Sequence, residues 1–519
     1  MSRAKKTLRG MAGLAVAGLA ALPLQAQVSP KIGSECATPG AQCFVLGAVS
    51  LEGLTAYEPG VLAPLYDSYL THEVGVADLT AIAAAITDRY RKDGYFLSRA
   101  VVPPQTPGGH TARIVIYEGY IDDVAMTGEG SESAAWALKA VTGKRPLRLA
   151  DLDRAISLAG DAPGIRVRTH LEPDLDDPAR HRLVAEATTD EVELSAYLDN
   201  RGPKSAGPWQ AYVRGALNSA LTVGDQLSLA VLAVPLKPSA FAFAELAYGL
   251  GVGGRSDRLR AAFTVGRAHD GADPVSRDIG SDSWSANLSY LKPLWRNRRI
   301  NSFAQLSVNA REVKQDWNTG GQYQDKVVAL RGMISATFTE PGESTNIWAQ
   351  VSAGKRDGVA NQLSRFDADR NFSKLNAHAA HYRDLGEHTG LYLSADAQYS
   401  PDRLLASEEF IVGGAPYGRG YSYASIGGDN GFVGTAELRA GFKPDSKGVT
   451  FLQTYAFLDA GKVWNRGAGS ADLASTGVGL RARIGERTTI GVEAAKPRKK
   501  VPYEQDMGWK PFLYISTVF

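Results

Sequence analysis

The sequence is poor in the residues that mark several common protein classes. Among 519 residues it has two cysteines and five methionines, and after residue 24 no apolar run approaches the ~18 residues of a membrane-spanning helix. Basic and acidic side chains nearly cancel, at 57 against 55, so the excess positive charge of nucleic-acid-binding proteins is missing. A membrane protein of this composition would have to be built from strands.

Sites for cofactors and catalysis are equally hard to find. The Gly-Lys pairs at 143–144, 354–355 and 461–462 lack the other residues of a phosphate-binding loop, so we expect no nucleotide. His378 and His381 form the one close histidine pair, and on a strand they would point to opposite faces, which argues against a metal. We therefore expect no cofactor and no enzyme; an exported hydrolase is the enzymatic alternative.

The N-terminus has the order of a secretory signal peptide. Four basic residues precede the apolar run Met11–Leu24, and Ala26 offers a small residue for cleavage, so residues 1–26 are predicted to be removed. A membrane-anchoring helix is the alternative, but the run is short for one. Export exposes Cys36 and Cys43, within residues 27–43, to an oxidising compartment. We expect a disulfide there, with two free thiols as the alternative.

Two repeated α+β modules are predicted next, over residues 44–119 and 120–190. In the first, residues 44–51 are strand-like, Pro59 opens a helix to Leu70, a second helix follows, and strands cover 96–102 and 111–117. The second helix has one apolar face formed by Leu79, Ile82, Ile86 and Tyr90. The same order returns as strand 121–127, helix 134–141, a helix through Leu149, Leu152, Ile156 and Ala159, and strands 165–171 and 182–187.

From residue 191 to 519 the helical period disappears and short alternating segments follow one another. Such alternation predicts strands with one apolar and one polar face, and an even count closes a bacterial outer-membrane barrel. Short and long connections also alternate, as in such barrels; a secreted soluble sandwich is the alternative. Sixteen segments begin near Glu191, Trp209, Gln226, Phe241, Leu259, Trp284, Ser302, Lys326, Asn346, Ser373, Gly390, Phe432, Thr450, Leu473, Thr489 and Lys510.

The longest connection, residues 401–431, carries the candidate mechanism. Glycines flank Arg419, which allows a tight turn that presents one guanidinium, and Asp459 is a carboxylate in an otherwise apolar strand. If the loop folds inward, Arg419 can pair with Asp459 and hold the loop tip in the lumen. A surface loop and a solvated aspartate are the alternatives. The candidate residues are Gly418, Arg419, Gly420, Tyr421, Asp459 and Gly461, with Phe410, Gly413 and Gly414 as loop support.

Together these motifs resemble the ShlB/FhaC/HecB (TpsB) family, the transporters of two-partner secretion. The resemblance covers nearly the whole mature chain. Its most specific part is the Arg-Gly-Tyr loop followed by the Asp-x-Gly strand. The other motifs on which the resemblance rests are Gly94-Tyr95, Val102-Pro103-Pro104-Gln105, Arg113–Gly119, Pro163-Gly164 and Asp199-Asn200-Arg201-Gly202.

The resemblance implies a mainly β protein, in which two periplasmic POTRA domains precede a 16-stranded outer-membrane barrel. It implies a translocase that captures an unfolded exoprotein and secretes it, with Arg419 contacting Asp459. An outer-membrane protein insertase is the nearest alternative and a passive porin a weaker one. Two departures are Gly418, where the family usually has an aliphatic residue, and the short segment 27–43, which leaves little room for a plug helix. Lys496, Arg498, Lys499 and Lys500 suggest an external loop near lipopolysaccharide phosphates.

Overall fold

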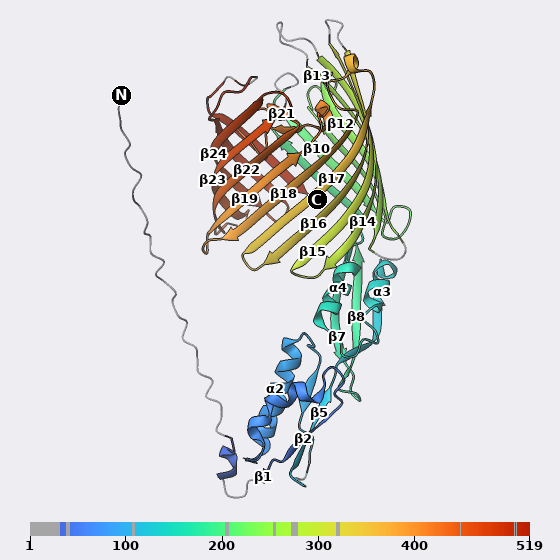
Figure 1. Cartoon of the computed structure of the whole chain (residues 1–519), viewed down its shortest axis with the longest axis vertical. Coiled ribbons are helices and arrows are strands. Elements are labelled where there is room, and N and C mark those ends of the chain that lie inside the picture. The colour runs from blue at the N-terminus through green and yellow to red at the C-terminus, as the bar shows by residue number, and fades with distance from the viewer. Residues whose placement is uncertain are drawn as a thin grey trace, which may run out of the picture. The chain divides into compact units, whose positions relative to one another are not determined.

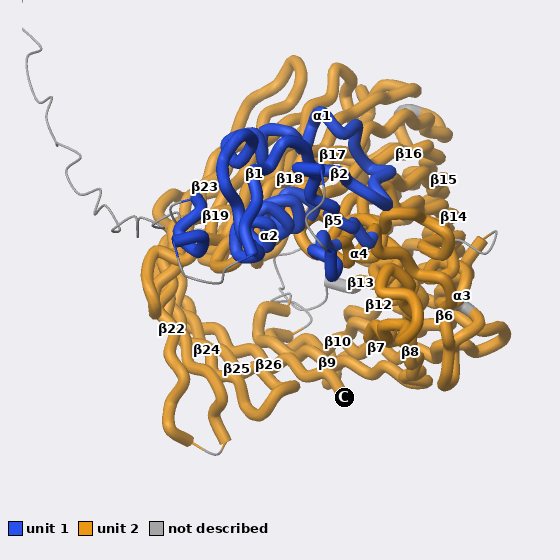
Figure 2. Tube along the Cα trace, turned by 90° about the horizontal axis from the view of Figure 1, so that it is seen from below, with its two compact units in different colours: residues 1–90, 99–117 blue, residues 91–98, 118–519 orange. Residues whose placement is uncertain are grey.

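The computed structural model describes residues 32–37, 42–105, 109–202, 207–252, 256–270, 279–317, 322–446, 448–502, 504 and 506–519. The predicted signal peptide lies outside the described residues. Contacts divide the chain into two compact units, residues 1–90 with 99–117 and residues 91–98 with 118–519 (Figure 2). No helix in the described residues is long and apolar enough to cross a bilayer.

The first unit combines short strands with one long helix, α2 (Val76–Lys92). The predicted apolar face of α2 is buried, and Ile82, Ile86 and Tyr90 are inaccessible to solvent. Strands β1 (Phe44–Val45) and β3 (Glu73–Val74) pair with each other, and β2 (Ala48–Glu52), β5 (Thr111–Tyr117) and β4 (Arg99–Val101) form a second sheet in that order. A disulfide joins Cys36, in the 3₁₀ turn η1 (Ser34–Ala37), to Cys43.

Two sequence predictions for this unit were wrong in extent. The single helix predicted from Pro59 to Leu70 is broken into α1 (Pro59–Leu62), η2 (Ala63–Leu65) and η3 (Asp67–Tyr69). Pro64 explains the break, because proline has no backbone N–H and disfavours the helical conformation of the residue before it. The strand predicted over 96–102 shrinks to β4, since the Ser98 amide donates to the Tyr95 carbonyl in a turn.

The second unit begins with a module that has the same sheet plan. Its strands are β6 (Tyr120–Thr127), β8 (Arg180–Thr189) and β7 (Ile165–Pro173), with β6 parallel and β7 antiparallel to β8. Helices α3 (Ser131–Lys139) and α4 (Leu149–Ala159) supply the fully buried Leu138 and the largely buried Leu152 to its core. In both modules the first strand therefore runs parallel to the third, as the predicted repeat requires.

The rest of the second unit is a closed antiparallel barrel of sixteen strands, which confirms the predicted fold class (Figure 1). The strands are β9 (Val192–Asp199), β10 (Gln210–Asn218), β11 (Gln226–Ala233), β12 (Phe241–Gly251), β13 (Arg258–Asp270), β14 (Ile279–Arg296), β15 (Ile300–Trp317), β16 (Gln322–Glu340), β17 (Glu343–Asp357), β18 (Asn371–Asp384), β19 (Thr389–Tyr399), β22 (Asn430–Phe442), β23 (Val449–Trp464), β24 (Ser470–Ile484), β25 (Thr488–Pro497) and β26 (Lys510–Val518).

Alternation along each strand sorts its side chains between the lumen and the lipid. In β23, Tyr455, Phe457 and Asp459 are buried inside, whereas Leu458 is 52% exposed on the outer face. Strands β14, β15 and β16 run to 18 or 19 residues and extend past the segments predicted from alternation. The pattern fades there because beyond the lipid band both faces of a strand can be polar. Phe519 lies one residue past β26 and is 62% exposed.

Candidate functional site

Residues 401–431 fold back against the inner wall of the barrel. The loop contains the turn η5 (Ala406–Glu408) and a small hairpin of β20 (Phe410–Val412) and β21 (Ile426–Gly428). The hairpin contacts β22, β23 and β24. An apolar cluster joins loop and wall, and Phe410 packs on it; its buried members are Val412, Tyr417, Tyr421, Ile426, Val433, Val463, Leu473 and Val501. The loop is thus part of the folded interior.

Arg419 and Asp459, the predicted pair, meet in this interior. The Arg419 Nε donates to Asp459 Oδ2 at 3.1 Å and Nη2 donates to Oδ1 at 2.7 Å, which makes a bidentate pair. The backbone amides of Gly418 and Arg419 donate to Oδ2 at 3.1 and 2.9 Å, and the Ser475 hydroxyl adds a bond of 3.0 Å. Asp459 is fully buried and Arg419 is 6% exposed. Loop tip and barrel strand are therefore held by charge-assisted bonds in a site shielded from water.

Arg419 has further partners that our sequence analysis missed. Its Nη1 donates to Glu437 Oε1 at 2.5 Å and lies 3.6 Å from Glu493 Oε2, and its Nη2 donates to the Thr435 hydroxyl at 2.8 Å. The guanidinium also stacks 3.4 Å above the Phe457 ring. Glu437 and Glu493 carry the signal that identified Asp459, a carboxylate in an apolar alternating strand, and that signal could have found them.

The glycines around this pair have specific structural reasons. Gly418 has a left-handed φ of +82°, which an L side chain adopts only with strain, so the departure from the usual aliphatic residue suits this backbone. A Cβ on Gly420 would come within 2.7 Å of the Pro497 backbone nitrogen. A Cβ on Gly461 would meet Val433 at 2.8 Å and Val412 of the loop at 3.0 Å. Gly461 thus leaves the space in which the loop packs.

The support residues fix the rest of the loop. Gly413 and Gly414 both have positive φ, and a Cβ on Gly413 would lie 2.5 Å from the Ser422 carbonyl oxygen. The Tyr421 hydroxyl lies 2.8 Å from the Ala474 carbonyl and accepts a bond from the Lys499 amide at 3.0 Å. Tyr421 thereby ties the loop to the basic segment 496–500, where Lys499 also pairs with Asp472.

A second set of charges holds the root of the loop. Glu408, 2% exposed, accepts bonds from Nη2 of Arg331 in β16 on both carboxylate oxygens, at 2.8 and 3.1 Å, and pairs with Lys374 of β18 at 2.8 Å. The Arg311 guanidinium donates to the Ser407 carbonyl at 2.6 Å. Burial by itself raises the pKa of Glu408, but Lys374 and Arg331 outweigh it and hold that pKa below the ordinary value. The loop is anchored at its root as well as at its tip.

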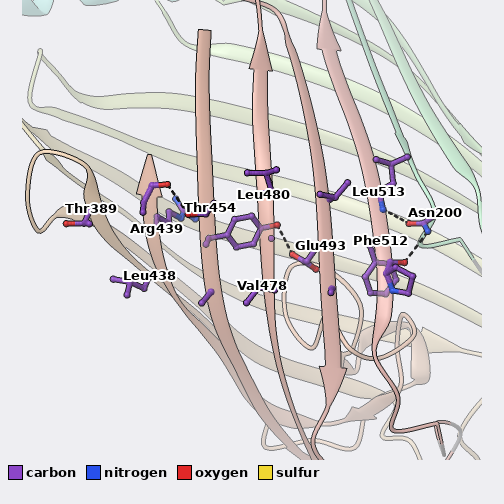
Figure 3. A pocket seen from close by; sticks show the side chains of 17 residues that line it. Asn200, Thr389, Leu438, Arg439, Thr454, Val478, Leu480, Glu493, Phe512 and Leu513 are labelled. Carbon is purple, nitrogen blue, oxygen red and sulfur yellow. Dashed lines mark hydrogen bonds between the residues drawn. The ribbon is translucent and has the colours of Figure 1, made fainter. Parts of the chain in front are cut away.

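His378 and His381 have separate partners in the structure. His378 contacts Asp396 at 2.6 Å and stacks on Trp348, whereas His381 contacts the Thr345 hydroxyl at 2.9 Å. Among the described residues no group of three or more potential ligands could hold a metal ion. The lumen instead concentrates hydrogen-bonded charges. In one of these contacts the Tyr455 hydroxyl donates at 2.9 Å to Glu493, which is labelled in Figure 3.

Comparison with known proteins agrees with this architecture. The family model of the POTRA domain, ShlB-type, matches residues 44–119, and that of the haemolysin secretion/activation protein ShlB/FhaC/HecB matches residues 276–482. The chain is 20% identical to the heme/hemopexin transporter protein HuxB of Haemophilus influenzae over 84% of this chain and 80% of that protein. It is 25% identical to the outer membrane transporter CdiB of Escherichia coli over 79% and 70%.

A solved structure of CdiB from Escherichia coli has the same fold. It aligns with a TM-score of 0.72 at 21% identity and covers 95% of this chain and 93% of its own. The sixteen-stranded barrel, the match to the ShlB-type POTRA model and the match to the ShlB/FhaC/HecB model all point to the same family. The chain therefore belongs to the ShlB/FhaC/HecB (TpsB) family of two-partner secretion transporters, with its barrel in the outer membrane and its POTRA domains in the periplasm.

Proposed function

We propose that this chain captures one exoprotein in extended form in the periplasm and passes it outward through the barrel, with residues 401–431 as the movable element of the pore. The exoprotein would be of the haemolysin or adhesin type, in line with the description of the matching family. The observation that carries the proposal is the buried pair of Arg419 and Asp459, which holds the loop tip inside the lumen.

Capture has a structural basis in the two periplasmic modules. Their three-stranded sheets end in β2 and β4 in the first module and in β6 and β7 in the second. An open sheet edge can accept an extended chain as an added strand, with main-chain bonds that tolerate many sequences. We infer that these edges hold the exoprotein unfolded until it enters the lumen.

Passage through the barrel requires the loop to move out of part of the lumen. Charge-assisted bonds form and break as discrete contacts, so the pair of Arg419 and Asp459 can define a closed position that the incoming chain displaces. Folding of the exoprotein outside the cell would then favour outward movement. External lipopolysaccharide would lie against the barrel rim, near Lys496, Arg498 and Lys500.

The test is a secretion assay in cells that express this chain together with its exoprotein. We expect R419Q and D459N each to reduce secreted exoprotein while leaving a heat-modifiable barrel in the outer membrane. The control is R260Q, which removes an exposed wall arginine paired with Glu245 and should secrete normally. Normal secretion by both loop variants would refute the gating role. Loss of many outer-membrane proteins on deletion of this chain would instead identify an insertase.

A further inference from the structure

The barrel closes along an unusually short strand pairing. Strands β26 and β9 share five residue pairs, from Tyr514 opposite Asp199 to Val518 opposite Ser195. Each of the other pairings around the described wall has at least eight pairs. We call this β26–β9 pairing the seam. Since hydrogen-bonded pairs alternate with non-hydrogen-bonded pairs along an antiparallel ladder, the shortest ladder has the fewest backbone hydrogen bonds to resist opening.

Asn200 extends the seam beyond the end of β9. Its backbone amide donates to the Leu513 carbonyl at 3.3 Å, its side-chain Nδ2 donates to the Pro511 carbonyl at 3.2 Å, and its Oδ1 accepts from the Leu513 amide at 2.8 Å. Figure 3 shows the two side-chain bonds. The Asn200 side chain thus makes bonds that the next residue of a longer β9 would make with β26. Because Asn200 is fixed in this way, the position of Arg201, the following residue, is fixed as well.

Arg201 reaches from the seam to the loop tip. Its guanidinium pairs with Glu493 of β25, stacks 3.7 Å above the Phe512 ring of β26, and donates through Nη1 to the Arg419 carbonyl at 3.3 Å. Its side chain is only 11% exposed. Glu493 in turn lies 3.6 Å from the Arg419 guanidinium. One arginine therefore contacts the loop tip, the strand beside the seam and a seam strand.

We propose that Arg201 is a positioning residue that couples the loop tip to the closure of the barrel. While the loop occupies the lumen, Arg419 and Arg201 share Glu493, and the Arg419 carbonyl helps to hold Arg201 on Phe512. When the loop leaves, Arg201 loses a hydrogen bond and Glu493 loses a cation, so the seam loosens. Wall strands and loop then respond together to the passing chain.

The coupling can be measured without an exoprotein, by amide hydrogen exchange of the purified full-length mature chain in lipid nanodiscs. The proposal rests on the movable loop of the proposed function, but the experiment reads the seam alone, so its failure leaves the secretion result standing. We expect R201Q to raise exchange in residues 510–518 and 192–199 by about threefold or more, the size expected for loss of a hydrogen bond.

The decisive variant is R419Q, because Arg419 contacts neither seam strand. We expect R419Q to raise exchange of the seam amides as well, and R201Q/R419Q to raise it no further than R201Q. R201K, which keeps the charge but loses the planar fork, should be intermediate. R260Q is the matched control and should leave the seam unchanged. An unchanged seam in R419Q, or additive effects in the double variant, would overturn the coupling.

Should R201Q fail to assemble, the R419Q comparison remains, since it keeps Arg201. F512L supplies a second route, because it removes the ring that Arg201 covers and retains an apolar side chain. We expect F512L to raise seam exchange and to reduce the response to R419Q. An equal response to R419Q in wild type and F512L would contradict a path through Arg201.

Discussion

At the scale of single residues, the loop site is an array of buried charges with matched partners. Arg201, Arg419, Arg439 and Arg481 surround Asp459, Glu437 and Glu493, and each carboxylate accepts bonds from at least one arginine. Among the described ion pairs Asp459 has Arg419 as its one cation, so removing Arg419 leaves a fully buried carboxylate without its counter-charge, a change that costs about 3–5 kcal/mol. The same contacts that close the loop thus penalise a half-open position, which favours a two-state loop.

The loop root provides a prediction of pH dependence. Because the pKa of Glu408 lies below its ordinary value, its pairs with Lys374 and Arg331 stabilise the folded loop at neutral pH. That stabilisation should persist down to the ordinary glutamate pKa of about 4.3 and disappear as the pH falls further. A spin label at Ala406→Cys should therefore gain mobility only below about pH 4.3, as seen in its electron paramagnetic resonance spectrum.

Two variants distinguish the effect of protonating Glu408 from that of protonating its neighbour Glu409. Burial raises the pKa of Glu409, and Asp429 adds to this, so Glu409 takes up its proton at a higher pH. E409Q should keep the low-pH transition. In E408Q the spin label should be mobile already at pH 7, because Arg331 and Lys374 lose their carboxylate partner. If the spin label in E408Q gains mobility at the same pH as in the parent protein, Glu408 is not the anchor.

Residue chemistry alone predicted part of this site. The sequence showed the arginine between two glycines and the carboxylate in an apolar strand, because each is unusual in its own segment. It did not show that Glu437 and Glu493 point at the same arginine, since strand register decides which inward side chains share a level of the lumen. Glu408 was missed for a different reason: it lies in an irregular loop, where no periodicity indicates burial.

At the scale of elements, alternation located all sixteen barrel strands but not all of their ends. The strands continue where the apolar face stops, so β14 to β16 are longer than predicted. The hairpin β20–β21 was also missed, because its strands of three residues are too short for a pattern. Proline explains the broken helix at 59–70. Tertiary contacts determine these strand ends and short elements, and a short stretch of sequence does not reveal such contacts.

One contact between elements also escaped the sequence. Helix α4 and its C-terminal turn meet the wall near the β14–β15 turn, where Asp161 pairs with Arg296 and Arg154 donates to the Leu294 carbonyl at 2.9 Å. The Asp161 carbonyl accepts a further bond from Arg258 at 3.0 Å. Several polar contacts between this helical segment and the barrel wall favour a defined but reversible docking.

We predict that D161N loosens this docking and leaves the loop site intact. Loss of the charge leaves the largely buried Arg296 without its carboxylate, so amide exchange should rise in α4 and at residues 294–300. Exchange in β22 to β25 should not change. D153N serves as the control, because its partner Arg298 is 78% exposed. Equal protection in D161N and wild type would show that the pair does not hold the module.

At the level of the whole molecule, the chain combines two α+β modules with a sixteen-stranded barrel whose loop 401–431 lies against the inner wall. Composition and alternation predicted the barrel, and the repeated order of elements predicted the two α+β modules before it. The inward position of the loop could be expected only from one potential ion pair. The structure adds a second anchor at Glu408 and the contact of Arg201 with the seam.

On the proposed function, residues 401–431 must leave their lumenal position for export. In the closed loop an added Cβ at Gly461 would lie 3.0 Å from Val412 Cγ1, close to the geometry of a disulfide. The variant V412C/G461C should therefore lock the loop when oxidised, with V412C and G461C alone as controls. We expect secretion to stop in the oxidised double variant and to return with reductant. Undiminished secretion through a chain shown to be fully cross-linked would contradict it.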